Sequence, residues 1–170
     1  ELRILAHLSG DPTMQYIFSL PAYNPDGSKN KEADIHGQTA DFLGIRRDLA
    51  KNCNFAVIYG ATDQTLMETA KIRSIEQARH LMGLWADKYP VAGNWIAQIQ
   101  GQTYNDPYAY TLYGRKIRLD IESPDIESMK RKNVNYRIQG SAAEIFKRSL
   151  LKCQHLDLAL QVHDEMLFDG

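Results

Sequence analysis

The sequence lacks several features that would place it in a specialised class of protein. Its two cysteines, Cys53 and Cys153, show neither the CxxC spacing of a metal site nor the several pairs of a disulfide framework. No apolar run approaches the roughly 18 residues of a membrane span, and the first residues do not form a signal peptide. We therefore expect a protein of a reducing compartment, with no membrane partner.

An excess of charge of one sign is also missing. The 20 Lys and Arg residues nearly balance the 21 Asp and Glu residues, and the formal net charge of -1 excludes a generally basic, histone-like protein. A basic groove can coexist with acidic surfaces, so nucleic-acid binding stays open. With 170 residues, 44% of them hydrophobic, the chain can bury one sizeable core. Both ends run into patterned apolar segments, and we expect a part of a longer protein.

Hydrophobic periodicity and turn residues predict a mostly helical chain. Helices are expected over residues 1–9, 12–20, 34–43, 45–59, 74–89, 91–103 and 126–152. The last of these is expected to bend near Gly140. A loop is expected over 21–31, a short hairpin over 108–119, and a strand, an acidic turn and a strand at the C-terminus. These elements predict an α+β fold, with a helical part and a small antiparallel sheet that ends in an acidic hairpin.

Local signals mark several helix ends. Pro12 suits the first turn of a helix. Gly44 and Gly60 are well placed to end helices, because glycine readily adopts the left-handed conformation common there. Ser74 and Gln77 match a capping box, in which the serine hydroxyl accepts a hydrogen bond from the backbone three residues later.

Two cations and an aromatic ring recur at intervals of four residues in the segment 46–60. Arg47, Lys51 and Phe55 would therefore share one helix face. Like charges at this spacing repel by a few tenths of a kcal/mol, and an anionic ligand would reverse the sign. Arginine can grip a phosphate through two hydrogen bonds, lysine adds a point charge, and the ring could stack on a base or a sugar. The alternative is an amphipathic helix with a solvated basic end and Phe55 in the core.

An acidic turn lies near the C-terminus. Asp164 and Glu165 stand between two apolar runs in the segment 161–168. Carboxylate oxygens are the usual ligands of Mg²⁺, which often binds one or two of them together with substrate phosphates. The alternative is an ordinary hairpin tip that carries acids because water surrounds it.

Further blocks join these two segments. Residues 46–60 fit RRxxxKxxNFxxxYG, residues 139–147 read QGSAAEIFK, and residues 161–165 read QVHDE, while 1–11 and 33–40 add two shorter blocks. In this order, and over essentially the whole chain, the blocks closely resemble the family A DNA polymerases of the bacterial DNA polymerase I type. The resemblance implies a fingers subdomain over 12–118 between palm segments at 1–11 and 119–170.

The resemblance also implies a site for an incoming deoxynucleoside triphosphate (dNTP). Arg47, Lys51 and His36 would contact its phosphates, and Phe55 would lie next to the sugar and select against dideoxynucleotides. Glu1 would block a ribose 2′-hydroxyl, and Tyr59 would lie near the templating base. Taken alone, each of these residues has a plainer interpretation: His36 could be a solvated histidine at a helix start, and Tyr59 a core residue with its hydroxyl at the surface.

A second implied set would bind primer-template DNA and carry the reaction. The DNA set comprises Arg131, Asn135, Gln139, His163 and Arg115, the last chosen because a basic turn suits phosphate contact. The catalytic set comprises Asp164, Glu165, His163 and Lys51. Asp164 would ligate the metals of a two-Mg²⁺ site, while another catalytic aspartate and the thumb are expected upstream of residue 1. Alternatively, Arg115 could belong to an exposed basic turn, and Gln139 before Gly140 could cap or kink a helix.

The resemblance implies template-directed DNA synthesis, with nucleotidyl transfer from a dNTP to the primer 3′-hydroxyl. We expect activity from the longer chain and little or none from these 170 residues alone, in the bacterial cytoplasm and nucleoid. Ala56 and Asp48, where family members often carry Gly and Arg, indicate a divergent or phage-encoded relative. Two alternatives stay open: a non-catalytic nucleic-acid-binding module, and a metal-dependent phosphohydrolase that uses His163, Asp164 and Glu165.

Overall fold

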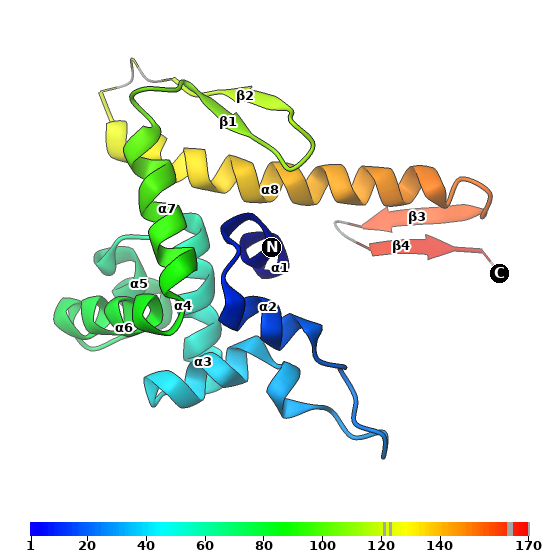
Figure 1. Cartoon of the computed structure of the whole chain (residues 1–170), viewed down its shortest axis with the longest axis horizontal. Helices are drawn as coiled ribbons and strands as arrows, with labels where there is room; N and C mark the ends of the chain where they lie inside the picture. The colour runs from blue at the N-terminus through cyan, green and yellow to red at the C-terminus, as the bar shows by residue number, and fades with distance from the viewer. Residues whose placement is uncertain (121, 123, 163–164, 170) are drawn as a thin grey trace.

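The computed structural model describes residues 1–120, 122, 124–162 and 165–169 (Figure 1). Helices dominate this part of the chain, as the sequence predicts, and two short hairpins complete the α+β fold. The elements in chain order are α1 (Leu2–Ser9), α2 (Pro12–Ser19), the 3-10 helix η1 (Lys31–Ala33), α3 (Ile35–Leu43), α4 (Arg47–Tyr59), α5 (Asp63–Ala70), α6 (Ile75–Lys88), α7 (Pro90–Gln102), β1 (Tyr108–Tyr110), β2 (Lys116–Arg118), α8 (Ile126–Lys152), β3 (Leu158–Val162) and β4 (Glu165–Phe168).

The helix ends confirm the local signals of the sequence. Gly44 follows α3 with φ of 65° and Gly60 follows α4 with φ of 61°, both in the left-handed region that glycine tolerates best. The Ser74 hydroxyl accepts a hydrogen bond from the Gln77 backbone N–H at 3.2 Å at the start of α6. Pro12 occupies the first turn of α2.

Helix α5 was not predicted, and its packing explains why. Leu66 is its only fully buried residue, so the segment shows almost no apolar period. The Thr62 hydroxyl accepts a hydrogen bond from the Thr65 backbone N–H and caps the helix. A short cap signal without an apolar stripe is easily mistaken for a loop.

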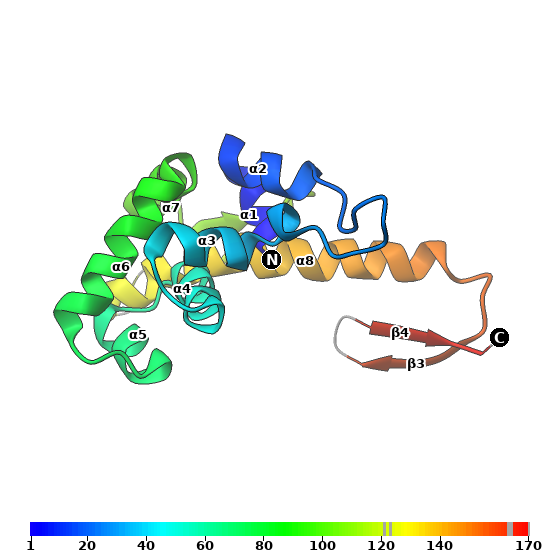
Figure 2. The same cartoon turned by 90° about the horizontal axis from the view of Figure 1, so that it is seen from below.

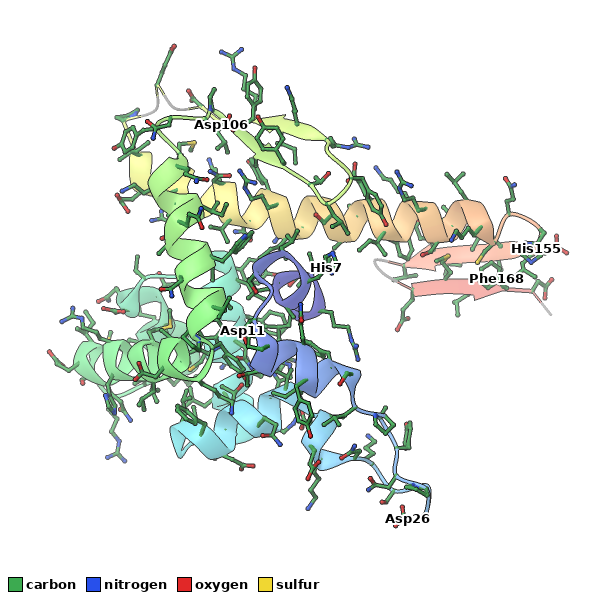
Figure 3. The ribbon with its side chains drawn as sticks, viewed as in Figure 1. His7, Asp11, Asp26, Asp106, His155 and Phe168 are labelled. Carbon is green, nitrogen blue, oxygen red and sulfur yellow. The ribbon has the colours of Figure 1, made fainter. Side chains whose placement is uncertain are left out.

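One buried carboxylate ties the N-terminal helices to α7. The Asp11 side chain accepts a hydrogen bond from the Met14 backbone N–H at 3.0 Å and another from the Ala92 backbone N–H at 3.1 Å. Figure 3 shows Asp11 between α2 and α7. Because Asp11 is fully buried, these bonds to two helix N-termini compensate the loss of water around its oxygens.

The main core takes residues from both ends of the chain. Leu5 of α1, Ile58 of α4, Trp85 of α6 and Ile138 of α8 belong to the same buried cluster. A second cluster lies among α3, α4, α5 and α6. The predicted fingers segment and both predicted palm segments thus share one core, and their division at 11/12 and 118/119 stays a prediction. In the part of the chain that the structure describes, no helix is long and apolar enough to span a bilayer.

The long helix α8 runs through Gly140 without a break, so the bend expected there is absent (Figures 1 and 2). A Cβ added at Gly140 would lie 2.8 Å from Thr111 Cγ2 and 3.1 Å from Ile117 Cδ1. The glycine therefore lets the β1–β2 hairpin lie directly against the helix. Its role is close packing, and Gln139 beside it neither caps nor kinks the helix.

The described strands form two separate antiparallel hairpins. In the first, Ala109 pairs with Ile117, and Gly114 lies in the predicted turn with φ of 80°. In the second hairpin, Val162 pairs with Glu165. This hairpin follows the end of α8 and lies to one side of the helices α1 to α8, which we call the helical body (Figures 1 and 2). Every residue of β3 is exposed, which distinguishes this hairpin from the rest of the fold.

Candidate functional site

The cationic stripe predicted from the sequence forms on α4, beside the start of α3. Arg47 and Lys51 are exposed, whereas Phe55 is partly buried against the main core. His36 of α3 lies next to this ring, with 5.8 Å between the ring centroids. Lys51 Nζ lies 5.9 Å from the centroid of Phe55. We call this group of four residues the cationic face.

Asp34 holds the guanidinium of Arg47. Arg47 Nε donates to Asp34 Oδ2 at 2.6 Å, and Nη2 donates to Oδ1 at 3.0 Å. The same carboxylate caps α3 through the His36 backbone N–H at 3.2 Å. The hydrogen bonds from Arg47, followed by those from backbone N–H groups, lower the pKa of Asp34 despite its partial burial. Asp34 thus supplies the anion that offsets the repulsion between Arg47 and Lys51.

The sequence reasoning missed Asp34, although its place directly before a helix is a cap signal. Side-chain exposures of 58% for Arg47 and 31% for Asp34 leave the pair open to water. Exposed ion pairs contribute about 0–1 kcal/mol. An anionic ligand could therefore replace the carboxylate at small cost in free energy.

A basic pocket of about 480 Å³ adjoins Arg47. Its lining brings together four cations and one acid: Arg3, Lys29, Lys31, Arg47 and Asp34. Lys29 lies between α2 and η1, and Lys31 is the first residue of η1, whereas the sequence predicted only a loop over 21–31. The excess of positive charge favours an anionic occupant.

A second group of predicted residues meets where α1, α4 and α8 approach one another. The Tyr59 hydroxyl donates to Glu1 Oε2 at 2.9 Å and to Oε1 at 3.1 Å. A hydrogen bond also joins the side chains of Gln139 and Tyr59. Burial and then the bond to Glu1 raise the pKa of Tyr59, so the phenol stays protonated at neutral pH. The ring stacks against Phe55 at 6.2 Å, which links this group to the cationic face.

Arg131, Asn135 and Gln139 lie four residues apart on α8 and therefore share one helix face. A Cβ added at Gly60 would lie 2.7 Å from Arg131 Cγ, so this side chain covers the end of α4. Asn135 Oδ1 is buried and, among the described residues, has no hydrogen-bond partner. We call these three residues the α8 row.

Arg115, also predicted to bind DNA, lies on the β1–β2 turn and outside the α8 row. Its Nε donates to Glu144 Oε1 at 2.6 Å, and the Thr111 hydroxyl donates to the other oxygen of the same carboxylate. These two hydrogen bonds lower the pKa of Glu144, the bond from Thr111 having the larger effect. Arg115 thus secures the hairpin to α8 through an ion pair that is largely exposed on the arginine side.

The acidic turn is only partly described. His163 and Asp164 lie outside the described residues, and Glu165 is exposed at the start of β4. Within residues 1–120, 122, 124–162 and 165–169 no group of three or more His, Cys, Asp and Glu side chains could hold a metal ion. The family resemblance predicts that this turn faces the cationic face across a cleft wide enough for one nucleotide, and this stays a prediction.

Asn54 is another residue that the sequence reasoning missed. Its amide nitrogen lies 2.8 Å from His36 Nδ1, and the residue is fully buried. A polar side chain on the core-facing side of a helix, one position before Phe55, was the available signal. Burial, followed by the charge of Arg47, lowers the pKa of His36 below its ordinary value.

These features define an α+β protein with a cationic face beside a polar row on a long helix. The chain belongs to DNA polymerase family A, whose sequence profile matches residues 1–170. The α+β class predicted from the sequence and the family to which its motifs pointed are both confirmed.

Known relatives and one solved structure support this membership. DNA polymerase I of Caldicellulosiruptor bescii is 32% identical over 183 residues, covering 100% of this chain and 21% of the relative. The thermostable DNA polymerase I of Thermus aquaticus is 29% identical, again over 100% of this chain and 21% of the relative. DNA polymerase I of Helicobacter pylori (strain ATCC 700392 / 26695) is 29% identical, over 99% of this chain and 19% of the relative.

One similar solved structure is the POL domain of Pol1 from M. smegmatis in complex with DNA primer-template and dNTP. Its TM-score is 0.77 at 28% sequence identity, with 99% of this chain and 31% of that chain covered. The chain therefore spans about a fifth of the length of the curated relatives, which are 19–21% covered.

Proposed function

We propose that this chain carries the nucleotide-binding part of a DNA polymerase that transfers nucleotidyl groups from a dNTP to a primer 3′-hydroxyl. One observation carries the proposal: the cationic face gathers exposed Arg47 and Lys51 with half-buried His36 and Phe55, at the positions that match the family motif. The relatives are named DNA polymerase I, and the similar structure holds primer-template DNA and dNTP, which supports this assignment.

In this proposal the cationic face binds the triphosphate. Arg47 presents a planar fork that suits a phosphate, and Lys51 supplies a point charge. Phosphoryl transfer depends mainly on positioning and on stabilising charge, so both cations would offset negative charge that develops on the leaving phosphates. Phe55, held against the core, would lie next to the sugar.

Glu1 and Tyr59 would select the sugar and the base pair. The Tyr59 hydroxyl donates hydrogen bonds of 2.9 and 3.1 Å to the Glu1 carboxylate and so holds it in place. The Tyr59 ring in turn stacks on Phe55. A carboxylate in this position would exclude a ribose 2′-hydroxyl and favour deoxyribonucleotides. Tyr59 would close the side toward the templating base.

The α8 row would contact the primer-template duplex. The buried Asn135 Oδ1 without a described partner is an acceptor that an N–H donor on a base edge could satisfy. An unsatisfied buried polar group costs about 1–3 kcal/mol, so a ligand that fills this position gains that amount. Arg131 and Gln139 would flank it, while His163 and Arg115 stay proposed contacts.

Mg²⁺ is the proposed cofactor, with Asp164 as ligand and Glu165 in support. The donor chemistry fits, because both side chains are carboxylates and Mg²⁺ prefers oxygen ligands. When bound, a pair of such ions lowers the pKa of an attacking hydroxyl and stabilises leaving phosphates. The described residues of this chain would bind the triphosphate, orient the sugar and stabilise charge.

The assignment of 12–118 to fingers and of 1–11 and 119–170 to palm belongs to the same proposal. So does a location in the bacterial cytoplasm and nucleoid, which the bacterial relatives support, or an origin in a phage. Because the chain spans about a fifth of its relatives, we expect these 170 residues alone to have little or no polymerase activity.

Nucleotide binding tests the proposal. Arg47→Ala and Lys51→Ala should each weaken dATP binding about tenfold, the loss of one charge-assisted hydrogen bond. Lys147→Ala, an exposed cation on α8, is the matched control. Equal affinities in all three variants would contradict the cationic face as the triphosphate site.

Primer extension tests the reaction. A full-length family A polymerase that carries these residues should extend a primer and release pyrophosphate, and Asp164→Ala should abolish both. Release of free phosphate would favour the phosphohydrolase alternative. Retention of all biological activity in Asp164→Ala would favour a non-catalytic nucleic-acid-binding module.

A further inference from the structure

A buried hydrogen-bond network lies directly behind His36. Asn54 of α4 is fully buried, and its amide oxygen accepts a hydrogen bond from Trp85 Nε1–H of α6 at 2.7 Å. Its amide nitrogen lies 2.8 Å from His36 Nδ1 and 3.3 Å from the Thr39 hydroxyl. Thr39 in turn contacts the Tyr89 hydroxyl at 2.8 Å. Asn54 thus connects the histidine to the core.

The indole of Trp85 determines how the Asn54 amide must be oriented. An indole N–H can only donate, so the group that faces it has to be the Asn54 oxygen. The NH₂ group then faces His36, and an amide nitrogen can only donate. His36 Nδ1 must therefore be the acceptor and carry no proton. In a neutral imidazole with a bare Nδ1, the proton is on Nε2.

The charges around the ring are consistent with a neutral histidine. Arg47 and Lys51 of α4 disfavour a further positive charge, and burial disfavours it more strongly, while Asp34 at the start of α3 favours it. Together these effects lower the pKa of His36. Between α6 and α7, burial raises the pKa of Tyr89 to about 12, so its hydroxyl does not ionise near neutral pH. The network therefore keeps one pattern of protons across the physiological range.

We propose that Asn54, held by Trp85, is a positioning residue that fixes His36 as the Nε2–H tautomer, so that His36 donates a hydrogen bond to the phosphates of the bound nucleotide. This inference rests on the proposed function for the identity of the ligand. The tautomer itself rests only on the network. The opposite tautomer, with the proton on Nδ1, would leave Nε2 bare and direct its lone pair at the phosphates. A protonated His36 would place a third positive charge beside Arg47 and Lys51.

Nitrogen NMR of the chain labelled with ¹⁵N-histidine tests the tautomer directly. At pH 7, Nε2 of His36 should give the signal of a protonated ring nitrogen and Nδ1 that of a bare one, and His36→Gln identifies the pair by removing it. Trp85→Phe removes the donor that orients Asn54, and the two tautomers of His36 should then mix. Tyr89→Phe, a matched loss of one polar group from the same network, should leave the tautomer unchanged.

Asn54→Asp gives a second test that depends on binding. Its carboxylate can still accept from Trp85, but it presents an acceptor to His36 Nδ1, which must then carry a proton. Above the pKa of the His36 ring in this variant, Nε2 loses its proton and can no longer donate to the phosphates. The dATP affinity of Asn54→Asp should therefore fall about tenfold between pH 6 and pH 9. The dATP affinity of the parent chain should change little over the same range. Circular dichroism of the variant confirms that it is folded.

The outcomes separate this inference from the proposed function. A protonated Nδ1 or an imidazolium at pH 7 in the parent chain overturns it, whether or not dATP binds. An unchanged tautomer in Trp85→Phe also overturns it, because Asn54 would then not depend on the indole. Absence of dATP binding to every form would count against the proposed function and would leave the tautomer result in place.

Discussion

The helical body and the β3–β4 hairpin differ in how far their apolar side chains are covered. Leu5 and Ile138 of the body are 0% exposed, whereas Leu160 and Leu167 of the hairpin are 52% and 53% exposed. Hydrogen bonds in the body also pair the buried side chains of Asp11 and Asn54, although Asn135 Oδ1 has no partner among the described residues. The cationic face is therefore supported by a packed framework. The described part of the β3–β4 hairpin buries little apolar surface and contributes little to the free energy of unfolding.

The largest expected effect tests this contrast directly. Leu5→Ala should lower the free energy of unfolding by about 2–5 kcal/mol, because it leaves a cavity in the main core. Leu160→Ala removes the same atoms from an exposed strand and should cost no more than about 0.5 kcal/mol. Urea denaturation of both variants measures the difference. Similar losses would mean that the hairpin is packed in solution and that the two regions do not differ in this way.

Two glycine substitutions extend the comparison to α8. Gly140→Ala should lower the free energy of unfolding by about 1–2 kcal/mol, since overpacking against the β1–β2 hairpin outweighs the gain in helix propensity. Gly83→Ala in α6 is the matched control, because a Cβ there would have no neighbour within 4 Å. That variant should gain about 0.5–1 kcal/mol. A gain in both would show that the hairpin can move away from α8 at no cost.

The half-buried His36 of the body makes the free energy of unfolding depend on pH. The pKa of His36 is lowered in the folded chain, mainly by burial. As pH falls below the unfolded value of about 6.5, the unfolded state binds the proton first, so stability decreases until pH reaches the folded pKa. His36→Gln should reduce this decrease between pH 7 and pH 5 in urea titrations. An equal decrease in the free energy of unfolding of His36→Gln would mean that other titratable groups cause the pH dependence.

The sequence predicted those parts of the body that depend on local chemistry. Gly44, Gly60 and Ser74 end or begin helices as expected, because caps involve only neighbouring residues. The spacing of Arg47 and Lys51 on one face of α4 also follows from helix geometry alone. Helix α5 was missed because its single buried leucine gives no period.

The remaining features depend on contacts between distant elements. Asp34 and Arg47 are 13 residues apart, and Asn54 and Trp85 are 31 apart. No periodic pattern links such pairs, so neither the internal anion of the cationic face nor the network behind His36 was predictable. The bend predicted at Gly140 was wrong for the same reason: the sequence does not reveal that a hairpin packs on that side of α8.

The smallest expected effect concerns the internal anion of the cationic face. Asp34→Asn keeps a side chain that caps α3 about equally well, but it removes the negative charge that holds Arg47. Since an exposed ion pair contributes about 0–1 kcal/mol, stability should change little, and dATP should bind about two- to fivefold more tightly. The gain should shrink at high salt, because screening weakens interactions between exposed charges.

Asp41→Asn is the matched control, since it removes an exposed carboxylate from the same helix without touching Arg47. Its dATP affinity should stay close to that of the parent chain. An equal gain in dATP affinity in both variants would mean that loss of any nearby negative charge strengthens binding, and that the ion pair between Asp34 and Arg47 has no specific effect. Weaker binding in Asp34→Asn would mean that Asp34 orients the guanidinium for the phosphate, and that the carboxylate assists the ligand instead of competing with it.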